Sequence, residues 1–229
     1  SDFDRLSEKA KQLGKSTQYT ASETASAMEY MAMAGWKAED MLNGIEGVMD
    51  LAAASGEDLA GVSDIVTDAM TAFGLSADGT TKIIKDGFTK EVSNASHFAD
   101  VLAAASANSN TNVAMLGESF KYAAPVAGSL GYSVEDTAIA LGLMASSGLK
   151  SSMAGSSLRT ILTNLAKPTD DISDAMDYLG ISLQNGDGSM KSLMDIVTDL
   201  RGAFGQCKMP MDQFQENLAK LDEKYANGE

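Results

Sequence analysis

The sequence predicts an all-α fold, in which a multi-helix globular domain carries one small β-hairpin and is flanked by coiled-coil-like helices. Of the 229 residues 44% are apolar, but these are mostly Ala, Met and Leu, with 6% aromatic residues and three prolines. Such side chains lose little conformational freedom in a helix, whereas β-branched and aromatic side chains lose more. Helix-capping residues and glycines also alternate along the chain, and both ends show helical apolar spacing.

The N-terminal end has apolar residues three and four positions apart. Phe3, Leu6, Ala10 and Leu13 follow this spacing, which is typical of the contact seam of a coiled coil. A plain amphipathic helix packed on the rest of the molecule has the same pattern, and two heptads do not separate the alternatives. We therefore predict that residues 1–19 form a helix, either a coiled-coil end or a packed helix.

Capping signals divide the first half of the central region, residues 20–205, into four short helices. Thr20 and Glu23 form a capping box before the first, and Gly35 ends it. Ser55 can cap the third, because acidic residues follow it where the helix dipole favours negative charge. Asp78-Gly79 breaks the chain before the fourth. The predicted ranges are 25–34, 38–54, from 56 to that break, and from the break to about 91.

The second half repeats these signals. A helix that contains 99–107 begins at Asn94 or Ser96, and Ser133 caps another. Pro125 should kink or divide a helix that runs from 113 to 130. The turn sequence at 185–188, Asn-Gly-Asp-Gly, predicts a short β-hairpin between 181–183 and 190–192. The remaining predictions are a helix over 152–167, a helix from about 192 to 205, and a linker at 205–210.

Two segments of the central region resemble each other. Residues 24–37 and 137–150 are identical at seven of fourteen positions, with a constant offset of 113 residues. Each segment ends at a glycine followed by another apolar helical stretch. A duplicated helical hairpin, at 24–54 and 137–167 and related by a pseudo-two-fold axis, explains the pattern. Chance similarity between Ala-rich helices is the alternative.

The C-terminal end, residues 206–229, has a second seam-like pattern at Met211, Phe214, Leu218, Leu221 and Tyr225. It predicts a coiled-coil-like helix, with a plain amphipathic helix as the alternative. Two heptad-like ends around a globular middle, in a chain that begins with Ser rather than Met, lead us to expect a piece of a longer protein.

The composition argues against several functional classes. Seventeen Lys and Arg against 32 Asp and Glu give a net charge of −15, which repels phosphate backbones and argues against specific nucleic-acid binding. Cys207 is the only cysteine, so the sequence excludes an internal disulfide and a cysteine-cluster metal site. No uninterrupted apolar run reaches the length of about 18 residues that spans a bilayer.

Candidate catalytic residues are few. His97 is the only histidine, and Ser147 with Lys150 matches the Ser-x-x-Lys spacing of some acyl transferases without the companion motifs. Glu118 and Glu135 are the carboxylates that a glycosidase-type mechanism would use, but the sequence shows no partner for either. The Asp-Gly pairs lack the spacing of a calcium loop. We expect no enzyme activity and no catalytic, cofactor-binding or metal site.

An ordered series of motifs extends from 99 to 159. It comprises Ala99-Asp100-Val101-Leu102, the Asn-rich turn at 108–112, Leu116-Gly117-Glu118-Ser119-Phe120-Lys121-Tyr122, residues 127–131, Val134-Glu135-Asp136-Thr137-Ala138 and Ala154-Gly155-Ser156-Ser157-Leu158-Arg159. This series resembles the core region of phage tail tape measure proteins, and weaker resemblance extends from about 22 to about 204.

The resemblance implies a structural protein that sets tail length during assembly and leaves the tail tube at DNA ejection. It implies tail-tip, tail-tube and tail assembly chaperone proteins as partners, and homo-oligomers through coiled coils in the full-length chain. The virion tail lumen, preceded by the host bacterial cytoplasm during assembly, is the expected location. This segment is too compact to be the ruler, so we expect a docking or nucleation head. An independent helical adaptor or scaffold is the alternative, and a tail-associated peptidoglycan hydrolase comes last.

Overall fold

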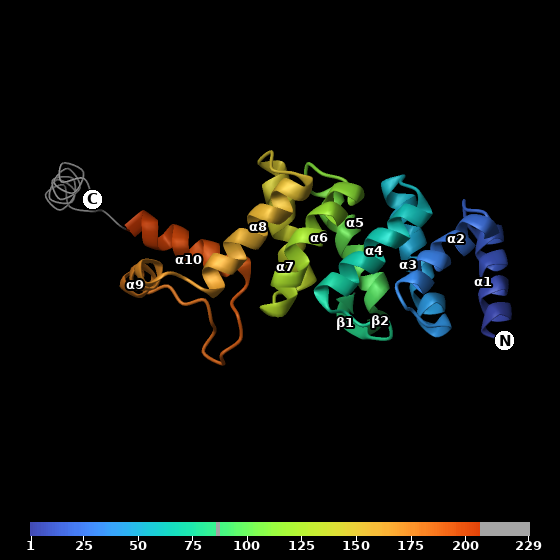
Figure 1. The fold of residues 1–229 in the computed structure, drawn as a ribbon, viewed down its shortest axis with the longest axis horizontal. Coiled ribbons are helices and arrows are strands. Elements are labelled where there is room, and N and C mark those ends of the chain that lie inside the picture. Colours follow the sequence, from blue (N-terminus) through green and yellow to red (C-terminus); the bar gives the residue numbers. More distant parts are fainter. Residues whose placement is uncertain (86–87, 207–229) are drawn as a thin grey trace, which may run out of the picture.

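A computed structural model describes residues 1–85 and 88–206, and it confirms the all-α fold with one small hairpin. Its elements follow one another along the stack shown in Figure 1. They are α1 (Asp2–Ser16), α2 (Ala21–Met33), α3 (Ala38–Ser55), α4 (Leu59–Phe73), β1 (Thr80–Lys85), β2 (Phe88–Ser93), α5 (Asn94–Ala107), α6 (Val113–Ser129), α7 (Val134–Ser146), α8 (Ser151–Ala166), α9 (Asp170–Leu179) and α10 (Leu193–Gln206).

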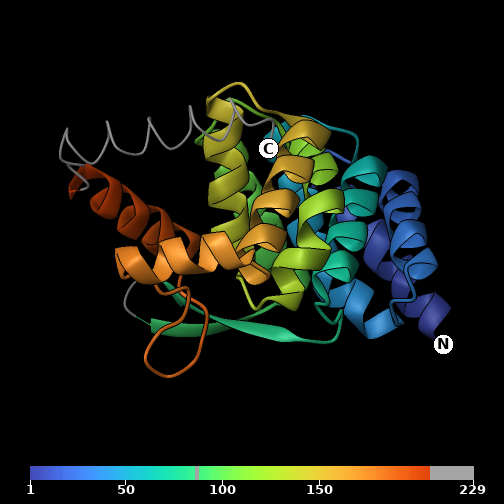
Figure 2. The same cartoon turned by 60° about the vertical axis from the view of Figure 1, so that its left-hand side comes forward.

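The helices pack in two rows, and from α2 to α8 each helix contacts mainly the second helix along the chain, whereas α1 contacts mainly α2. One row consists of α2, α4, α6 and α8, and the other of α1, α3, α5 and α7, with α10 added against α7. Figures 1 and 2 show the result, an elongated stack that runs from the N-terminus to α10. The arrangement is that of a solenoid, in which each unit contacts its neighbours and the core is continuous along the stack.

The centre of the core is aromatic. Phe120 on α6 lies between Phe98 on α5 and Phe73 on α4, with ring centroids 5.4 Å and 6.1 Å away. Phe98 and Phe120 are fully buried. Both pairs are tilted, as the quadrupoles of the rings favour. These three side chains join the two rows at the middle of the stack.

Small residues set the distance between helices in the even-numbered row. A Cβ atom on Gly155 of α8 would lie 2.2 Å from the Ser119 carbonyl oxygen on α6. The buried Ser119 hydroxyl lies 2.8 Å from the Ser151 carbonyl oxygen, which joins α6 to the start of α8. Gly117 likewise admits Ile65 of α4, at 2.5 Å from its missing Cβ. Two of the motifs that resemble tape measure proteins, at 116–122 and 154–159, therefore contain residues that bring α6 close to α4 and α8.

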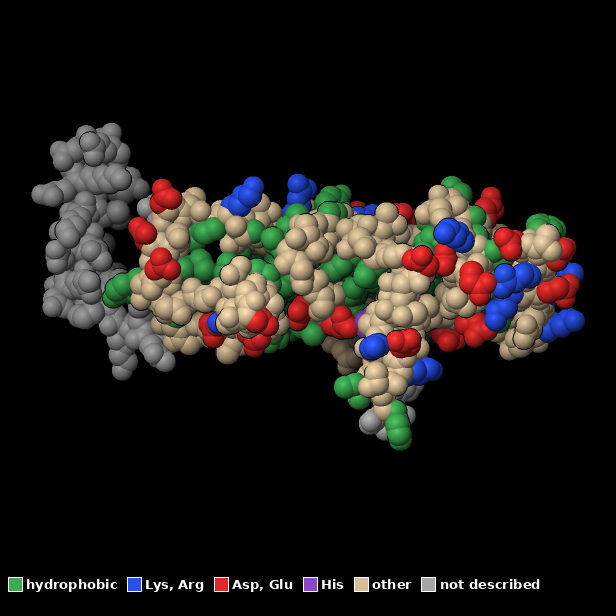
Figure 3. Space-filling model, turned by 90° about the horizontal axis from the view of Figure 1, so that it is seen from below, with side chains coloured by type: hydrophobic (Ala, Val, Ile, Leu, Met, Phe, Trp, Pro, Cys, Tyr) green, Lys and Arg blue, Asp and Glu red, His purple; other side chains and the backbone are tan. Residues whose placement is uncertain are grey.

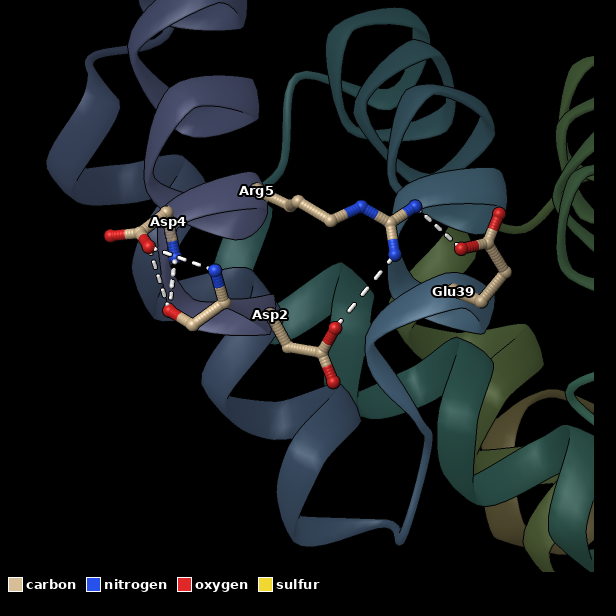
Figure 4. A network of polar contacts seen from close by, with 5 residues as sticks. Asp2, Asp4, Arg5 and Glu39 are labelled. Carbon is tan, nitrogen blue, oxygen red and sulfur yellow. Dashed lines mark hydrogen bonds and ion pairs between the residues drawn. The ribbon is translucent and has the colours of Figure 1, made fainter.

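Helix α1 packs on the stack as an amphipathic helix. Its Ala10 and Leu13 are buried, whereas Phe3 is 77% exposed. Ion pairs join it to α3: Arg5 Nη2 lies 2.6 Å from Glu39 Oε2, and Lys9 contacts Glu46. Figure 4 shows Arg5 reaching from α1 to Glu39. The pairs are exposed, so they orient α1 more than they stabilise it. A coiled-coil end at 1–19 stays a prediction.

The hairpin lies at 80–93 and not at the predicted 181–192. The helix expected up to residue 91 is wrong, because Thr80–Lys85 and Phe88–Ser93 pair as antiparallel strands. The register pairs Lys85 with Phe88 and leaves Asp86-Gly87 between the strands. Asp-Gly flanked by β-branched residues is a strong hairpin signal. It outweighs the weak helical periodicity of this stretch.

The hairpin predicted at 181–192 is reduced to one isolated bridge between Gln184 and Met190. In its place is a loop, within which the Asp187 carboxylate accepts hydrogen bonds from the Ser189 hydroxyl and amide. Those bonds lower the pKa of Asp187. Helix α9 was not predicted at all. Its N-cap is Thr169, directly after Pro168, which follows the helix predicted over 152–167.

Other boundaries differ in detail. Asp58, not Ser55, caps α4, because Gly56 ends α3 in the left-handed conformation and Ser55 is its last residue. Glu57 does not act in the first turn of α4. Its carboxylate accepts a hydrogen bond from the Ala114 amide at the start of α6. Pro125 lies within α6, which runs undivided from Val113 to Ser129.

The two resembling segments have the same boundaries at the offset of 113 residues. Helices α2 and α7 begin at 21 and 134 and end at 33 and 146, and α3 and α8 begin at 38 and 151. Both first helices close with matching hydrogen bonds, Trp36 amide to Met31 carbonyl and Leu149 amide to Met144 carbonyl. The intervening glycines, Gly35 and Gly148, have positive φ. These matches support a duplicated hairpin, which stays a proposal.

Candidate functional site

Two residues singled out in the sequence lie together. His97 Nε2, near the start of α5, is 2.7 Å from Glu135 Oε1 on the first turn of α7. The imidazole is largely buried, with 14% of its side chain exposed. The contact links the starts of two helices of one row.

The other candidates have structural surroundings as well. The Ser147 hydroxyl donates to the Leu143 carbonyl oxygen at the end of α7, and Lys150 is the N-cap residue of α8. Glu118 is half-buried on α6. Two apolar hollows, described below, lie between α5, α7, α8 and α10, and Glu118 lines neither of them. Cys207 and the C-terminal seam lie outside the described residues. The expectation of no catalytic residue stays a prediction.

Within residues 1–85 and 88–206, no group of three or more His, Cys, Asp and Glu side chains is placed to hold a metal ion. In the same ranges no helix combines the length and the apolar character that crossing a lipid bilayer requires.

The first apolar hollow lies between α5 and α7 and has a volume of about 370 Å³. We call it the α5–α7 hollow. Small residues of α5, including Ala104 and Ala105, form one wall, and Ile139 and Leu143 of α7 form the other. Ile139 is 50% exposed and Leu143 is 56% exposed. Exposed branched side chains on a helix whose opposite face is already buried indicate a contact surface.

The second hollow, of about 280 Å³, lies between α7, α8 and α10. We call it the α10 trough. It shares Ile139 and Leu143 with the first hollow, and Ile161 of α8 and Met194 and Val197 of α10 form its other sides. These last three side chains are also about half exposed. The two hollows therefore form one apolar surface divided by a ridge of α7.

Charge and apolar character are separated along the stack. Figure 3 shows Lys, Arg, Asp and Glu crowded over the N-terminal helices, and hydrophobic side chains gathered over the C-terminal half. The hairpin projects from the stack and exposes Ile84 and Phe88 near its tip. The apolar surface for contacts therefore lies toward the C-terminal half of the described residues.

The predictions from the sequence do not include this surface, although α7 carries a signal for it. Its stretch Ala138-Ile139-Ala140-Leu141-Gly142-Leu143-Met144 is apolar around the whole circumference. Only one side of a helix in a two-row stack is covered, so such a helix has apolar side chains left over.

Comparison with known proteins decides what this helical stack belongs to. Residues 7–221 match the family described as phage-related minor tail protein, which is most of the chain. The chain belongs to this family.

Two relatives agree with this membership. The tape measure protein of Pneumococcus phage Dp-1 is 37% identical over 202 residues, which are 88% of this chain and 16% of that protein. The probable tape measure protein of Escherichia phage P2 is 25% identical over 216 residues, 94% of this chain and 25% of that protein. The resemblance to tape measure proteins is thus confirmed. The chain spans about a sixth to a quarter of these relatives.

No solved structure matches the chain. Neither relative is named as an enzyme, and membership of this minor tail family gives the chain a structural role in a phage tail.

Proposed function

We propose that the chain is the docking or nucleation head of a tape measure protein that sets tail length during virion assembly. Two relatives named as tape measure proteins, each four to six times longer than the matched segment, support this proposal. A helix advances about 1.5 Å per residue, so the length of an extended helical protein sets a tube length directly. A folded stack has no such relation between residues and length, so this segment holds the ruler rather than forming it.

The observation that carries the docking role is the exposed apolar surface on α7. Ile139 and Leu143 protrude between two hollows at the end of the stack away from the charged N-terminal helices. Tail-tip, tail-tube or tail assembly chaperone proteins are its proposed partners. The proposed location is the tail lumen, after assembly in the host cytoplasm, and the protein leaves the tube at DNA ejection.

The ruler function is tested by tail length in the phage that encodes the chain. An in-frame deletion of about 50 residues outside this segment should shorten the tail by about 75 Å in electron micrographs. An unchanged length would reject the tape measure function and favour an independent helical adaptor.

The docking function needs a separate test, because a protein can set tail length without using the apolar surface on α7 for docking. Leu143→Asp places a charge on the exposed ridge and should reduce the number of assembled tails without altering their length. Met33→Asp is the matched control, since Met33 is 76% exposed on α2 at the other end of the stack. Equal tail numbers for the two variants would reject the docking surface.

A further inference from the structure

The hairpin and the α5–α7 hollow have complementary surfaces. We propose that the hairpin of one copy of the chain inserts Ile84 and Phe88 into the α5–α7 hollow of a second copy. Both surfaces belong to the same part of the molecule, since β2 leads directly into α5, which forms one wall of the hollow. The inference does not depend on the tape measure function, and it leaves the α10 trough to the proposed tail partners.

The hairpin is incompletely packed on its own stack. Its contacts with the helices are mainly with α5, and a two-stranded hairpin is only marginally stable in water without further packing. Ile84 is 82% exposed and Phe88 is 76% exposed, and Figure 3 shows the hairpin projecting from the stack. The register pairs Ile84 with Thr89, so Ile84 and Phe88 lie on opposite faces. The hairpin therefore presents an apolar side chain on each face, as contact with both walls of a groove requires.

The hollow has room for such side chains. Its volume is about 370 Å³, and small residues, Ala104, Ala138 and Gly142, form part of its lining. Ile139 and Leu143 of α7 protrude beside them and are half exposed. Insertion of Ile84 and Phe88 would remove apolar surface from water on both molecules, and this burial favours association.

The charges of the two surfaces are also complementary. Glu135 lines the hollow and is 48% exposed, and the exposed Asp100 directly precedes the α5 wall. The lining of the hollow contains no Lys or Arg. On the hairpin, Lys82 pairs with Glu91, and Lys90 adds a further exposed positive charge. A basic hairpin in a chain of net charge −15 therefore meets an acidic edge, which favours this orientation of the two copies.

A second copy is the occupant that these observations favour. Every copy carries both halves of the contact, and both halves are present at the same concentration. A self-complementary contact of this kind can be repeated around a symmetry axis, which gives a closed oligomer.

Sedimentation velocity of the purified full chain over a range of concentrations tests the proposal. The unmodified chain should self-associate, and Phe88→Asp and Ala104→Glu should each raise the Kd of association at least about tenfold. Met33→Asp is the matched control, because Met33 is also 76% exposed but lies on α2, and it should leave the Kd unchanged. Circular dichroism checks that the variants keep their helical content.

Three results would overturn the proposal. A chain that stays monomeric at all concentrations has no such contact. Association that neither Phe88→Asp nor Ala104→Glu weakens would be formed by other residues. If only one of the two variants weakened it, the hairpin and the hollow would not be partners. None of these readouts involves tail assembly, so they leave the docking function on α7 untouched.

Engineered cysteines give a second measurement, which leaves Ile84 and Phe88 in place. Two variants in a Cys207→Ser background, Thr89→Cys and a tagged Ala104→Cys, are mixed and mildly oxidised, and a disulfide-linked dimer with one tag should form. Thr80→Cys replaces Thr89→Cys in the control, since Thr80 is an equally exposed threonine at the base of the hairpin. It should give little mixed dimer. Absence of the mixed dimer, or an equal yield from the control, would overturn the proposed contact.

Discussion

At the residue scale, the contact between Gly155 and Ser119 is the most restrictive in the described stack. The missing Cβ of Gly155 would lie 2.2 Å from the Ser119 carbonyl oxygen, closer than any other Cβ position at a glycine of the described ranges. A backbone atom cannot move aside as a flexible side-chain end can, so α8 must shift away from α6 if this glycine is replaced.

Gly155→Ala should therefore destabilise the protein by about 1–3 kcal/mol, the usual cost of overpacking a well-packed contact. Urea denaturation followed by circular dichroism measures the change. Gly202→Ala is the matched control, because no atom of the described residues lies within 4 Å of its added Cβ on α10. Alanine should stabilise that helix by about 0.5–1 kcal/mol. A loss of stability in both variants would contradict the packing argument.

Single residues were predictable where the cause is local. The Thr20–Glu23 capping box and the Ser133 cap are present as predicted, because a cap depends on three or four neighbouring residues. The importance of Gly155 was not predictable. The glycine belongs to a recognisable motif, but a glycine is required there because of its contact with a serine 36 positions earlier on another helix. The pairing of His97 with Glu135 is of the same kind.

At the element scale, the hairpin at 80–93 shows the weight of a local turn signal. A helix is predicted up to about residue 91, although this stretch contains the turn sequence Asp86-Gly87. Two six-residue strands on either side of a two-residue Asp-Gly link are the expected consequence of that turn. At 185–188 the turn signal is as strong, but no alternating strands flank it. A turn sequence therefore predicts a hairpin only together with its flanking residues.

The start of α2 makes a prediction about acid stability. Hydrogen bonds from the Thr20 amide and hydroxyl lower the pKa of Glu23 below its ordinary value of 4.5. A lowered folded-state pKa contributes stability above pH 4.5, and this contribution is lost as the pH falls through the lowered value. Glu23→Gln should therefore lower the Tm at about pH 7, and the difference from the unmodified protein should shrink at about pH 3.

Glu29→Gln is the control for this experiment, since Glu29 is an exposed carboxylate on the same helix. It should leave the Tm nearly unchanged at both pH values. A Tm difference for Glu23→Gln that is the same at both pH values would show that the carboxylate charge is not the cause.

At the scale of the whole molecule, the two-row arrangement follows from contacts that no short pattern contains. From α2 to α8 each helix packs mainly on the second helix along the chain, some 35–55 residues away, whereas α1 packs mainly on α2. The sequence predicts the helices because their periodicity and caps are local, but the pairing of helices depends on distant small residues such as Gly117 and Gly155. The apolar surface on α7 has the same origin, since only the assembled stack shows which faces remain uncovered.

The stack also predicts how the protein opens. In a solenoid-like array, stability is shared between neighbours, so a helix with neighbours on both sides is better protected than a terminal one. Helices α4 and α6 lie in the middle and contain fully buried side chains such as Val62 and Phe120. Helix α1 lies at one end and has Phe3 and its charged face in solvent.

Native-state hydrogen exchange should therefore show the slowest amides in α4 and α6 and at least about tenfold faster exchange in α1. Phe120→Ala should cost about 3–5 kcal/mol, because a cavity forms where the two rows meet, and it should speed exchange in both central helices. Leu13→Ala should speed exchange mainly in α1 and α2, the elements joined at that end of the stack. If every described helix exchanged at one common rate, the molecule would open as a single cooperative unit, and the neighbour-by-neighbour account of its stability would be wrong.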